Sequence, residues 1–370
     1  MRRQSLVKLC VLSFVIVIAS CKKDKIEFVA PEEPPPANTD GSILNITALY
    51  LDEIKYTPST ALVEFKSVAF GREANGVRPA IPLTFSGWTH PSVLYFEKKW
   101  NNYHYWAALT PYPDTDSQYE NPHIFCSDDG VKWIEPKGII NPIDPCPPGF
   151  GFNSDVNLML DKNILYCYWR ATENNQRAIY IRKSADGVHW GEKETVCIMP
   201  YGVVDVIAPS FLKDGNSYYC YSVCGVENEA GSFYNRYSIR RMVSSDPIKF
   251  NPEKDKGFDL INVNGRPWGN EQEPWHIEVK KLKNIWMMLV TTTGLNRYGG
   301  GGRLFMGYST DGKDFTFSNK SIGDFTASTY KSSFNARMDP IQNKINVEMW
   351  RAMMSNGWAV FHDNFSIKVK

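Results

Sequence analysis

Acidic, aromatic and basic residues recur beside the short apolar runs of this chain. Such a mixture suits sugars, because aromatic faces stack on C–H surfaces while charged groups bond to hydroxyls. Paired carboxylates in such a site can also exchange protons with a substrate. The carboxylates that could do this chemistry are Asp155, Glu273, Glu120 and Asp205. The candidate substrate-binding residues are His90, Arg170, Trp275, His276, Arg303 and Tyr330.

Each candidate carboxylate has a sequence context that also allows a structural role. Asp155 opens the apolar run DVNLML and could cap a strand. Glu273 precedes Pro-Trp-His and could belong to a solvated loop. Glu120 precedes Asn-Pro and could begin a turn, and Asp205 is an isolated charge between two valines. The two histidines could be satisfied channel residues.

A repeated turn motif organises the chain that positions these residues. Ser-x-Asp-Gly followed by an aromatic residue three positions later recurs at about sixty-residue spacing, and repeats of this length are typical of propellers and arrays. Serine and aspartate can cap backbone N–H groups, and glycine can adopt the positive φ of a tight turn. The segments are Ser127–Trp133, Ser184–Trp190, Ser309–Phe315, and Ser244–Phe250 with Pro247 in place of glycine.

Short strand-like runs precede each of these turns, which predicts an all-β fold. Repeated small sheets around one axis form a β-propeller, in which the innermost strand of each blade lines a central channel. We therefore predict five blades over roughly residues 70 to 370, with the run 43–51 closing the ring. A two-sheet sandwich is the alternative, and the regular spacing disfavours it. The turns themselves are expected to be structural.

The turns and the five repeats resemble the five-bladed propellers of glycoside hydrolase family 43 and its relatives. The resemblance implies hydrolysis of a glycosidic bond by an inverting mechanism, which needs two carboxyls on opposite faces of the bond. It places the tuning aspartate of those enzymes at Asp155. It also implies a possible cation near the axis, such as calcium, for which His276 is a candidate metal ligand. No other cofactor is expected.

Two departures from the pattern of that family leave other functions open. The base is usually in an Asp-Pro that opens the first blade, where this chain has His90-Pro91. The acid usually precedes a Gly-Pro or Ala-Pro in the third blade, where Ile207 precedes Ala208-Pro209. Either other carboxylates perform the hydrolysis, or the protein is a non-catalytic glycan-binding propeller. A third possibility is a scaffold in an envelope complex.

The N-terminal residues predict export to the cell envelope. Residues 1–20 combine basic residues with an apolar run too short to span a membrane, as in a signal peptide. Small residues before Cys21 resemble a lipoprotein processing site, although an ordinary signal peptide is the alternative. Residues 21–42 would form a lipidated, proline-rich tether and 43–370 one propeller domain. We expect a lipid anchor in the outer membrane, facing either side.

Composition excludes several other classes. The 370 residues include 41 Lys and Arg against 40 Asp and Glu, so no basic excess exists for a nucleic acid. The cysteines show no zinc spacing, and the glycine run 299–302 lacks the ending of a phosphate-binding loop. We expect a monomer whose partner is an oligosaccharide or polysaccharide and whose membrane contact is the lipid alone.

Overall fold

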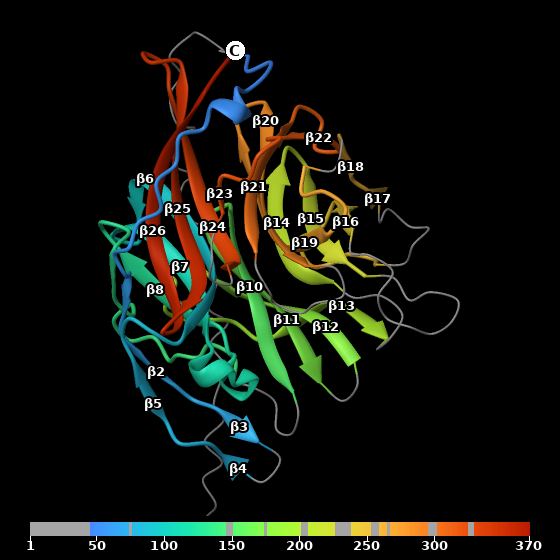
Figure 1. The fold of residues 1–370 in the computed structure, drawn as a ribbon. Coiled ribbons are helices and arrows are strands. Elements are labelled where there is room, and N and C mark those ends of the chain that lie inside the picture. The colour runs from blue at the N-terminus through green and yellow to red at the C-terminus, as the bar shows by residue number, and fades with distance from the viewer. Residues whose placement is uncertain are drawn as a thin grey trace, which may run out of the picture.

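The computed structural model describes residues 45–73, 76–145, 151–173, 176–200, 206–225, 238–252, 259–264, 267–294, 302–324 and 329–370. Five antiparallel sheets stand around one axis, which confirms the predicted five-bladed β-propeller (Figure 1). Each of the five innermost strands contacts the next around the ring. Within the described residues, no helix has the length and apolar character that crossing a membrane requires.

The first three blades follow the chain as simple meanders from the axis outward. Blade one contains β6 (Trp88–Trp100), β7 (Tyr103–Pro111), β8 (His123–Ser127) and the short β9 (Lys132–Trp133). Blade two contains β10 (Phe152–Asp161), β11 (Ile164–Glu173), β12 (Gln176–Ser184) and β13 (Glu194–Pro200). Blade three contains β14 (Ile207–Asp214), β15 (Ser217–Cys224), β16 (Ser238–Ser244) and β17 (Asp259–Leu260).

The last two blades and the connecting elements complete the ring. Blade four contains β19 (Gln272–Leu282), β20 (Ile285–Gly294), β21 (Arg303–Ser309) and β22 (Asp314–Phe317), with β18 (Asn262–Val263) and β23 (Gly323–Asp324) at its edge. Blade five contains β24 (Thr329–Asp339), β25 (Lys344–Ser355) and β26 (Gly357–Lys368). The other elements are β1 (Glu64–Phe65), β2 (Ser67–Ala69), β3 (Arg72–Glu73), β4 (Gly76–Val77), β5 (Ile81–Leu83), and the 3₁₀ turns η1 (Leu51–Glu53), η2 (Pro113–Thr115) and η3 (Ser117–Tyr119).

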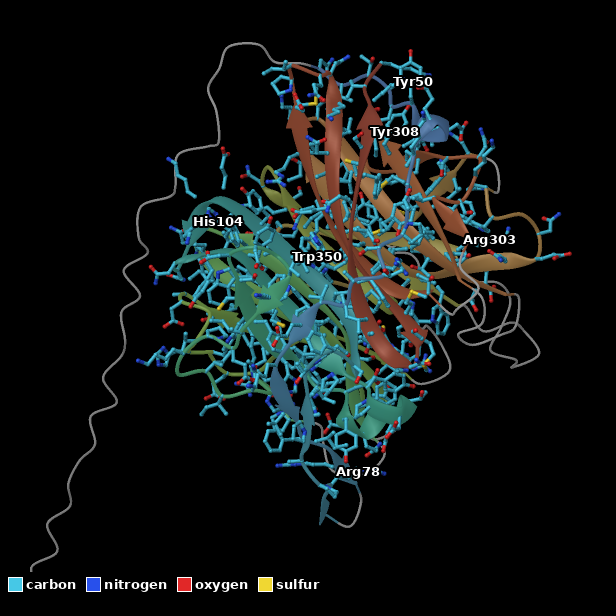
Figure 2. All side chains as sticks on the ribbon, turned by 60° about the vertical axis from the view of Figure 1, so that its left-hand side comes forward. Tyr50, Arg78, His104, Arg303, Tyr308 and Trp350 are labelled. Atoms are coloured by element: carbon cyan, nitrogen blue, oxygen red, sulfur yellow. The ribbon has the colours of Figure 1, made fainter. Side chains whose placement is uncertain are left out.

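The N-terminal segment closes the ring, as the sequence predicts. Leu49 bridges Val369, and Leu62 bridges Phe361, so this segment runs along the open edge of β26. Beyond it, β1 pairs in parallel with β9 of blade one. The chain therefore joins the last blade to the first. Figure 2 shows Tyr50 and Arg78 at opposite ends of the molecule, with Trp350 between them.

A buried ion pair fixes this closing segment to blade five. Arg351 Nε lies 3.0 Å from Asp363 Oδ2, and both side chains are almost fully buried. The same guanidinium donates to the Tyr56 hydroxyl and to the carbonyl of Ser59, while the Ser59 amide donates to Asp363 Oδ1. Both charges thus have hydrogen-bond partners from the closing segment, which burial of an ion pair requires.

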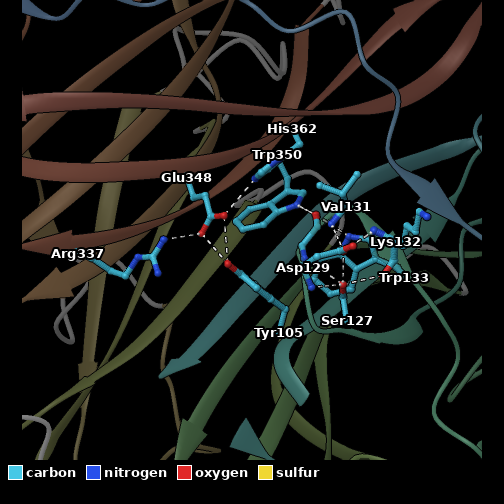
Figure 3. Close-up of polar contacts among 11 residues, drawn as sticks. Tyr105, Ser127, Asp129, Val131, Lys132, Trp133, Arg337, Glu348, Trp350 and His362 are labelled. Atoms are coloured by element: carbon cyan, nitrogen blue, oxygen red, sulfur yellow. Dashed lines mark hydrogen bonds and ion pairs between the residues drawn. The ribbon is translucent and has the colours of Figure 1, made fainter. Parts of the chain in front are cut away.

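The repeated turns contact the preceding blade. In blade one, the Asp129 carboxylate accepts the amides of Val131 and Lys132, as expected for the motif. The carbonyl of Gly130 accepts hydrogen bonds from the indoles of Trp133 and of Trp350 in blade five, and Tyr105 donates to Glu348 of blade five beside them (Figure 3). These contacts form the seam between the first and last blades.

The other turns repeat this arrangement. Tyr168 of blade two donates to the carbonyl of Pro247, and Tyr221 of blade three donates to the carbonyl of Gly312. Gly187 lies so close to Trp106 of blade one that a Cβ would come within 2.1 Å of its ring. The turns are therefore structural, as predicted, and they join neighbouring blades.

Polar side chains on the inner strands link the blades around the channel. Ser92 Oγ accepts the amide of Leu158, and Asn157 Oδ1 accepts the amide of Phe211. Ser210 Oγ accepts the amide of Val279, Ser333 Oγ accepts the amide of Val93, and Ser333 also donates to Glu278. These five polar residues stand one level along the channel from the candidate site. The residues two positions before them, nearer the start of each inner strand, are His90, Asp155, Ala208, His276 and Lys331.

The described cysteines are buried hydrophobic residues. Cys126, Cys167, Cys197, Cys220 and Cys224 are free thiols, and Cys146 lies outside the described residues. Burial raises the pKa of the Cys167 thiol well above its usual range. These side chains therefore fill core volume between the blades and carry no disulfide.

Candidate functional site

Two histidines and an aspartate meet at the axis, one from each of three blades. His90 Nε2 and His276 Nε2 each lie 3.4 Å from Oδ1 of Asp155. All three residues are at most 2% exposed. Among the described residues, these three form the cluster whose donor atoms lie close enough together to bind one metal ion.

Irregular backbone at the start of the inner strands aims these side chains at the axis. His90 and Asp155 have φ values of 52°, and Ala208 at the same place in blade three has 47°. Such values are uncommon for residues other than glycine and occur at functional sites. The ladders of β6, β10 and β14 shift register at these residues. In β19 the shift falls at Trp275, which turns the next residue, His276, inward.

The geometry around Asp155 fits a metal centre. Asp155 Oδ1 is buried, and the His90 and His276 nitrogens that face it lie at the long end of the hydrogen-bond range. Donors bound to a tetrahedral ion at about 2.1 Å lie about 3.4 Å from one another. That separation equals the two distances from Asp155 Oδ1 to the imidazoles. Two imidazoles with one carboxylate are ligands that first-row transition metals accept.

Electrostatics leave the three groups in the protonation states that metal binding needs. Burial lowers the pKa of His90 to about 3 and also lowers the pKa of His276, so both rings are neutral near pH 7. Burial acts to raise the pKa of Asp155, but His90, His276 and Arg170 hold it well below its usual range. The site therefore offers two neutral nitrogen donors and a carboxylate.

A second polar contact orients His90. Its Nδ1 lies 2.6 Å from the hydroxyl of Thr110, on the neighbouring strand β7. A metal-binding histidine usually donates its other ring N–H to such an acceptor, which fixes the tautomer. The Thr110 contact therefore leaves Nε2 of His90 directed at Asp155.

Glu120 stands beside this cluster with a perturbed carboxyl group. Its Oε1 lies 3.6 Å from His90 Nδ1, and its side chain is buried. Turn η3 precedes it, and its carbonyl accepts the amide of Asn153 in blade two, which fixes its backbone. Burial raises the pKa of Glu120 well above its usual range, Asp155 raises it further, and Arg170 opposes both. A carboxyl group with a raised pKa can exchange a proton near neutral pH.

A row of aromatic rings leads away from the cluster. The Tyr330 ring lies 4.2 Å from the His276 ring and 5.0 Å from the His90 ring. Trp358 follows at 4.8 Å from Tyr330, and Tyr112 at 5.8 Å from Trp358. Trp358 donates to the hydroxyl of Thr115, whose backbone φ of 62° is strained for a β-branched residue. We name Tyr330, Trp358 and Tyr112 the aromatic row.

The structure brings together six of the residues that the sequence singles out: His90, Glu120, Asp155, Arg170, His276 and Tyr330. Arg170 Nη1 lies 3.7 Å from Asp155 Oδ2. Their arrangement differs from the predicted roles. Asp155 was expected to act as a catalytic carboxylate and His90 to contact the substrate, whereas in the structure Asp155 lies between the imidazoles of His90 and His276.

The other predicted site residues stand outside this group of six. Trp275 packs in the core between blades three and four, with its ring 5.3 Å from that of His276, and its role in substrate binding stays a prediction. Glu273 is buried on β19 and pairs with Thr293 in the ladder. Arg303 is exposed at the start of β21, where its amide donates to the Thr292 hydroxyl. Asp205 and Cys21 lie outside the described residues.

The sequence did not single out Thr110 or Trp358, and it did not predict that His90, Asp155 and His276 form a candidate metal site. The available signal was the position of two histidines near the starts of two inner strands, His90 before a proline and His276 after a tryptophan. Trp358 follows the tip of the last hairpin, a place that the repeat pattern does not associate with the channel.

Comparison with known proteins places the fold among carbohydrate-acting enzymes. No protein-family model matches the chain. A stretch of 110 residues is 41% identical to an A type blood N-acetyl-α-D-galactosamine deacetylase of Flavonifractor plautii, covering 28% of this chain and 14% of that protein. The match thus spans a small part of the length of the relative.

Solved structures agree over most of the chain. A crystal structure of an N-acetylgalactosamine deacetylase from F. plautii with blood group B trisaccharide has a TM-score of 0.70 at 20% identity, covering 85% of this chain and 95% of that one. A thermostable family-43 glycoside hydrolase has a TM-score of 0.54 at 13% identity, covering 85% and 96%. The resemblance to family-43 propellers is therefore confirmed for the fold, which this chain shares with a deacetylase and with a glycosidase.

Proposed function

We propose that this chain is a metal-dependent deacetylase that removes the acetyl group from an N-acetylated sugar of a glycan. The observation that carries the proposal is the buried donor set of His90, Asp155 and His276 beside Glu120. The 41% identity of one stretch to a sugar deacetylase supports it. Inverting hydrolysis of a glycosidic bond needs two carboxyls on opposite faces of that bond. Hydrolysis of an amide does not have this requirement.

The donor set favours a transition metal over the calcium that the resemblance to family-43 enzymes implied. Calcium prefers six to eight oxygen ligands, whereas His90 and His276 present nitrogen. A divalent cation held here would polarise the amide carbonyl and increase the acidity of a nearby water. The neutral state of both imidazoles supports this assignment.

The protein groups around the cluster fit the proton transfers of amide hydrolysis. Water adds through its oxygen to the acetyl carbonyl carbon, and Glu120 accepts the proton that the water loses. The C–N bond then breaks, the sugar nitrogen takes a proton from Glu120, and acetate and the free amine leave. The raised pKa of Glu120 suits it to both transfers.

The aromatic row supports a sugar as the substrate. Tyr330 contacts both imidazoles, so a pyranose ring stacked along Tyr330 and Tyr112 would have its substituents within reach of the cluster. Both tyrosines are half-buried, which leaves part of each ring open to a ligand. Aromatic platforms of this type bind the C–H faces of sugars.

Glycosidic hydrolysis is the second candidate function. Glu120 and Asp155 are both buried at the axis of a fold that a family-43 glycoside hydrolase shares. Those two carboxyls would then serve as acid and base on a glycosidic bond. The position of Asp155 between two imidazoles favours the deacetylase.

One assay separates these functions. The protein is incubated with N-acetylated oligosaccharides and with their deacetylated counterparts, with and without a chelator, while acetate and new reducing ends are measured. A deacetylase releases acetate without reducing ends and loses this activity with the chelator. Reducing ends without acetate would establish the glycosidase. Saturable binding with neither product would establish a glycan-binding protein.

We also propose that lipid on Cys21 anchors the chain in the outer membrane, as the N-terminal sequence suggests. Labelling of cells with a fatty-acid analogue should mark the wild-type protein. The Cys21→Ser variant should remain unmarked and move to the soluble fraction. Equal labelling of both would contradict the anchor.

A further inference from the structure

The inner strand of blade five carries a buried lysine beside the candidate metal cluster. Lys331 is fully buried on β24, and its Nζ crosses the channel to donate a hydrogen bond to the carbonyl of Val156 on β10. Its charge interacts with Glu278 and Asp155, and also with His90 and His276. No role in the proposed proton transfers requires this lysine.

The carbonyl that Lys331 contacts belongs to the bulge that aims Asp155. The ladder between β10 and β11 shifts between Ser154 and Asn157, so Asp155 and Val156 have no regular partners. Asp155 also has a φ of 52°, which persists only where surrounding contacts hold it. A hydrogen bond to the next carbonyl along the chain is such a contact.

We propose that Lys331 is a positioning residue that holds the Val156 carbonyl and thereby directs the Asp155 carboxylate into the metal cluster. This inference rests on the metal centre of the proposed function. Lys331 does not ligate the ion. It acts through the backbone of the residue that follows a ligand, as outer groups of metal sites act through the ligands themselves.

A second lysine makes the same kind of contact at an ordinary position. Lys280 Nζ donates to the carbonyl of Val93, 3.2 Å away, and pairs with Glu278 at 2.9 Å. Val93 pairs regularly with Ala107 and lies beyond the bulge at His90. Lys280 is therefore the matched control for a lysine that links two inner strands without contacting a bulge.

The test is Zn²⁺ titration by calorimetry on the full chain, with wild type, Lys331→Met, Lys331→Gln and Lys280→Met, and with thermal unfolding of each. Lys331→Met should weaken Zn²⁺ binding by about tenfold or more. Lys331→Gln keeps a donor and should bind within about threefold of wild type, as should Lys280→Met even where its unfolding temperature falls.

The sign of the change makes the test decisive. Loss of a nearby positive charge alone would strengthen cation binding, so equal or tighter binding by Lys331→Met would overturn the inference. Equal weakening by Lys280→Met would also overturn it. If Lys331→Met does not fold, Lys331→Gln decides, and binding weaker than wild type by more than about tenfold contradicts the role. Absence of binding by wild type would refute the metal centre itself, which is a separate result.

Discussion

At the scale of single residues, the properties of the candidate site depend on the burial of a few polar side chains. His90 and His276 are neutral because burial lowers their pKa values, and Glu120 has a raised pKa for the same reason. Burial thus favours metal binding by the imidazoles and proton exchange by Glu120, since it disfavours the charged form of each. One physical effect accounts for both properties of the site.

Replacement of Glu120 should separate proton transfer from metal binding. Glu120→Gln keeps the size and polarity of the side chain but cannot accept a proton. We expect acetate release to fall by about 10²–10⁴-fold, with Zn²⁺ affinity and unfolding temperature close to wild type. Single-turnover kinetics and calorimetry measure the two quantities. Undiminished acetate release in this variant would exclude Glu120 as the proton carrier.

The candidate residues could be found from sequence, but their roles could not. Asp155 and His276 stand out because each lies near the start of a predicted inner strand, and Glu120 because it lies in the loop before the third strand of blade one. Whether the same residues ligate a metal or flank a substrate depends on distances between blades. The positive φ values at His90 and Asp155 also direct these two side chains, and no sequence pattern specifies those values.

At the scale of elements, the repeated turns join blades as well as ending hairpins. Tyr168, Tyr221 and Trp350 each donate from one blade to a turn carbonyl of the next. The conformation of the turn was predictable, because Ser, Asp and Gly act on their own backbone within a few residues. The partner ring was not, because it lies on another blade and belongs to no local pattern.

Two glycine substitutions should separate backbone strain from blade packing. Gly187 and Gly215 both have positive φ, but a Cβ on Gly187 would meet Trp106 at 2.1 Å whereas nothing lies within 4 Å of one on Gly215. Gly215→Ala should cost about 1–2 kcal/mol of unfolding free energy from strain alone. Gly187→Ala should cost about 1–3 kcal/mol more, because its methyl group overpacks the contact. Urea unfolding of both variants measures this difference, and equal losses would refute the packing role.

The turn of blade two should also give a pH-dependent contribution to stability. Burial opposes ionisation of Asp186, but hydrogen bonds from the His189 ring and from the amides of His189 and Val188 lower its pKa to about 2. An unfolded aspartate has a pKa of about 3.9. The carboxylate therefore stabilises the fold above about pH 4 and loses this effect as the pH falls toward 2.

The unfolding free energy of an Asp186→Ala variant, compared with that of wild type at several pH values, tests this pH dependence. The difference in unfolding free energy between wild type and variant should be largest above about pH 5 and should shrink as the pH falls toward 2. Urea unfolding at several pH values measures it. A difference that stays constant across this range would show that the charge of Asp186 contributes nothing.

At the scale of the whole molecule, the propeller stays closed because its N-terminal segment is bound to its last blade. The Leu49–Val369 and Leu62–Phe361 bridges and the Arg351–Asp363 pair all fix this segment. The inner strands then keep fixed spacing, and the cluster at the axis depends on that spacing. The sequence predicted closure by residues 43–51 because one strand was missing. It did not predict the contacts of the buried ion pair with Tyr56 and Ser59, which lie far from blade five in the chain.

Removal of one partner from this pair should weaken the whole fold. Arg351→Met leaves the Asp363 carboxylate buried without its charge partner, which should cost about 3–5 kcal/mol of unfolding free energy. Lys368→Met removes an exposed pair between the end of β26 and Glu53 of η1, and its unfolding free energy should stay close to that of wild type. Urea unfolding gives both values. Similar costs for the two variants would show that the buried pair does not fix the closing segment.

The most direct test of a metal-dependent deacetylase uses protein from which metal has been stripped. This protein is mixed with an N-acetylated oligosaccharide, Zn²⁺ or Mn²⁺ is added stepwise, and the release of acetate is measured. We predict no release from the stripped wild type and full recovery near one equivalent of the effective ion. His276→Ala should stay inactive at the same ion concentration while retaining the wild-type fold by circular dichroism. Full activity of the stripped protein, or reducing ends in place of acetate, would contradict a metal-dependent deacetylase.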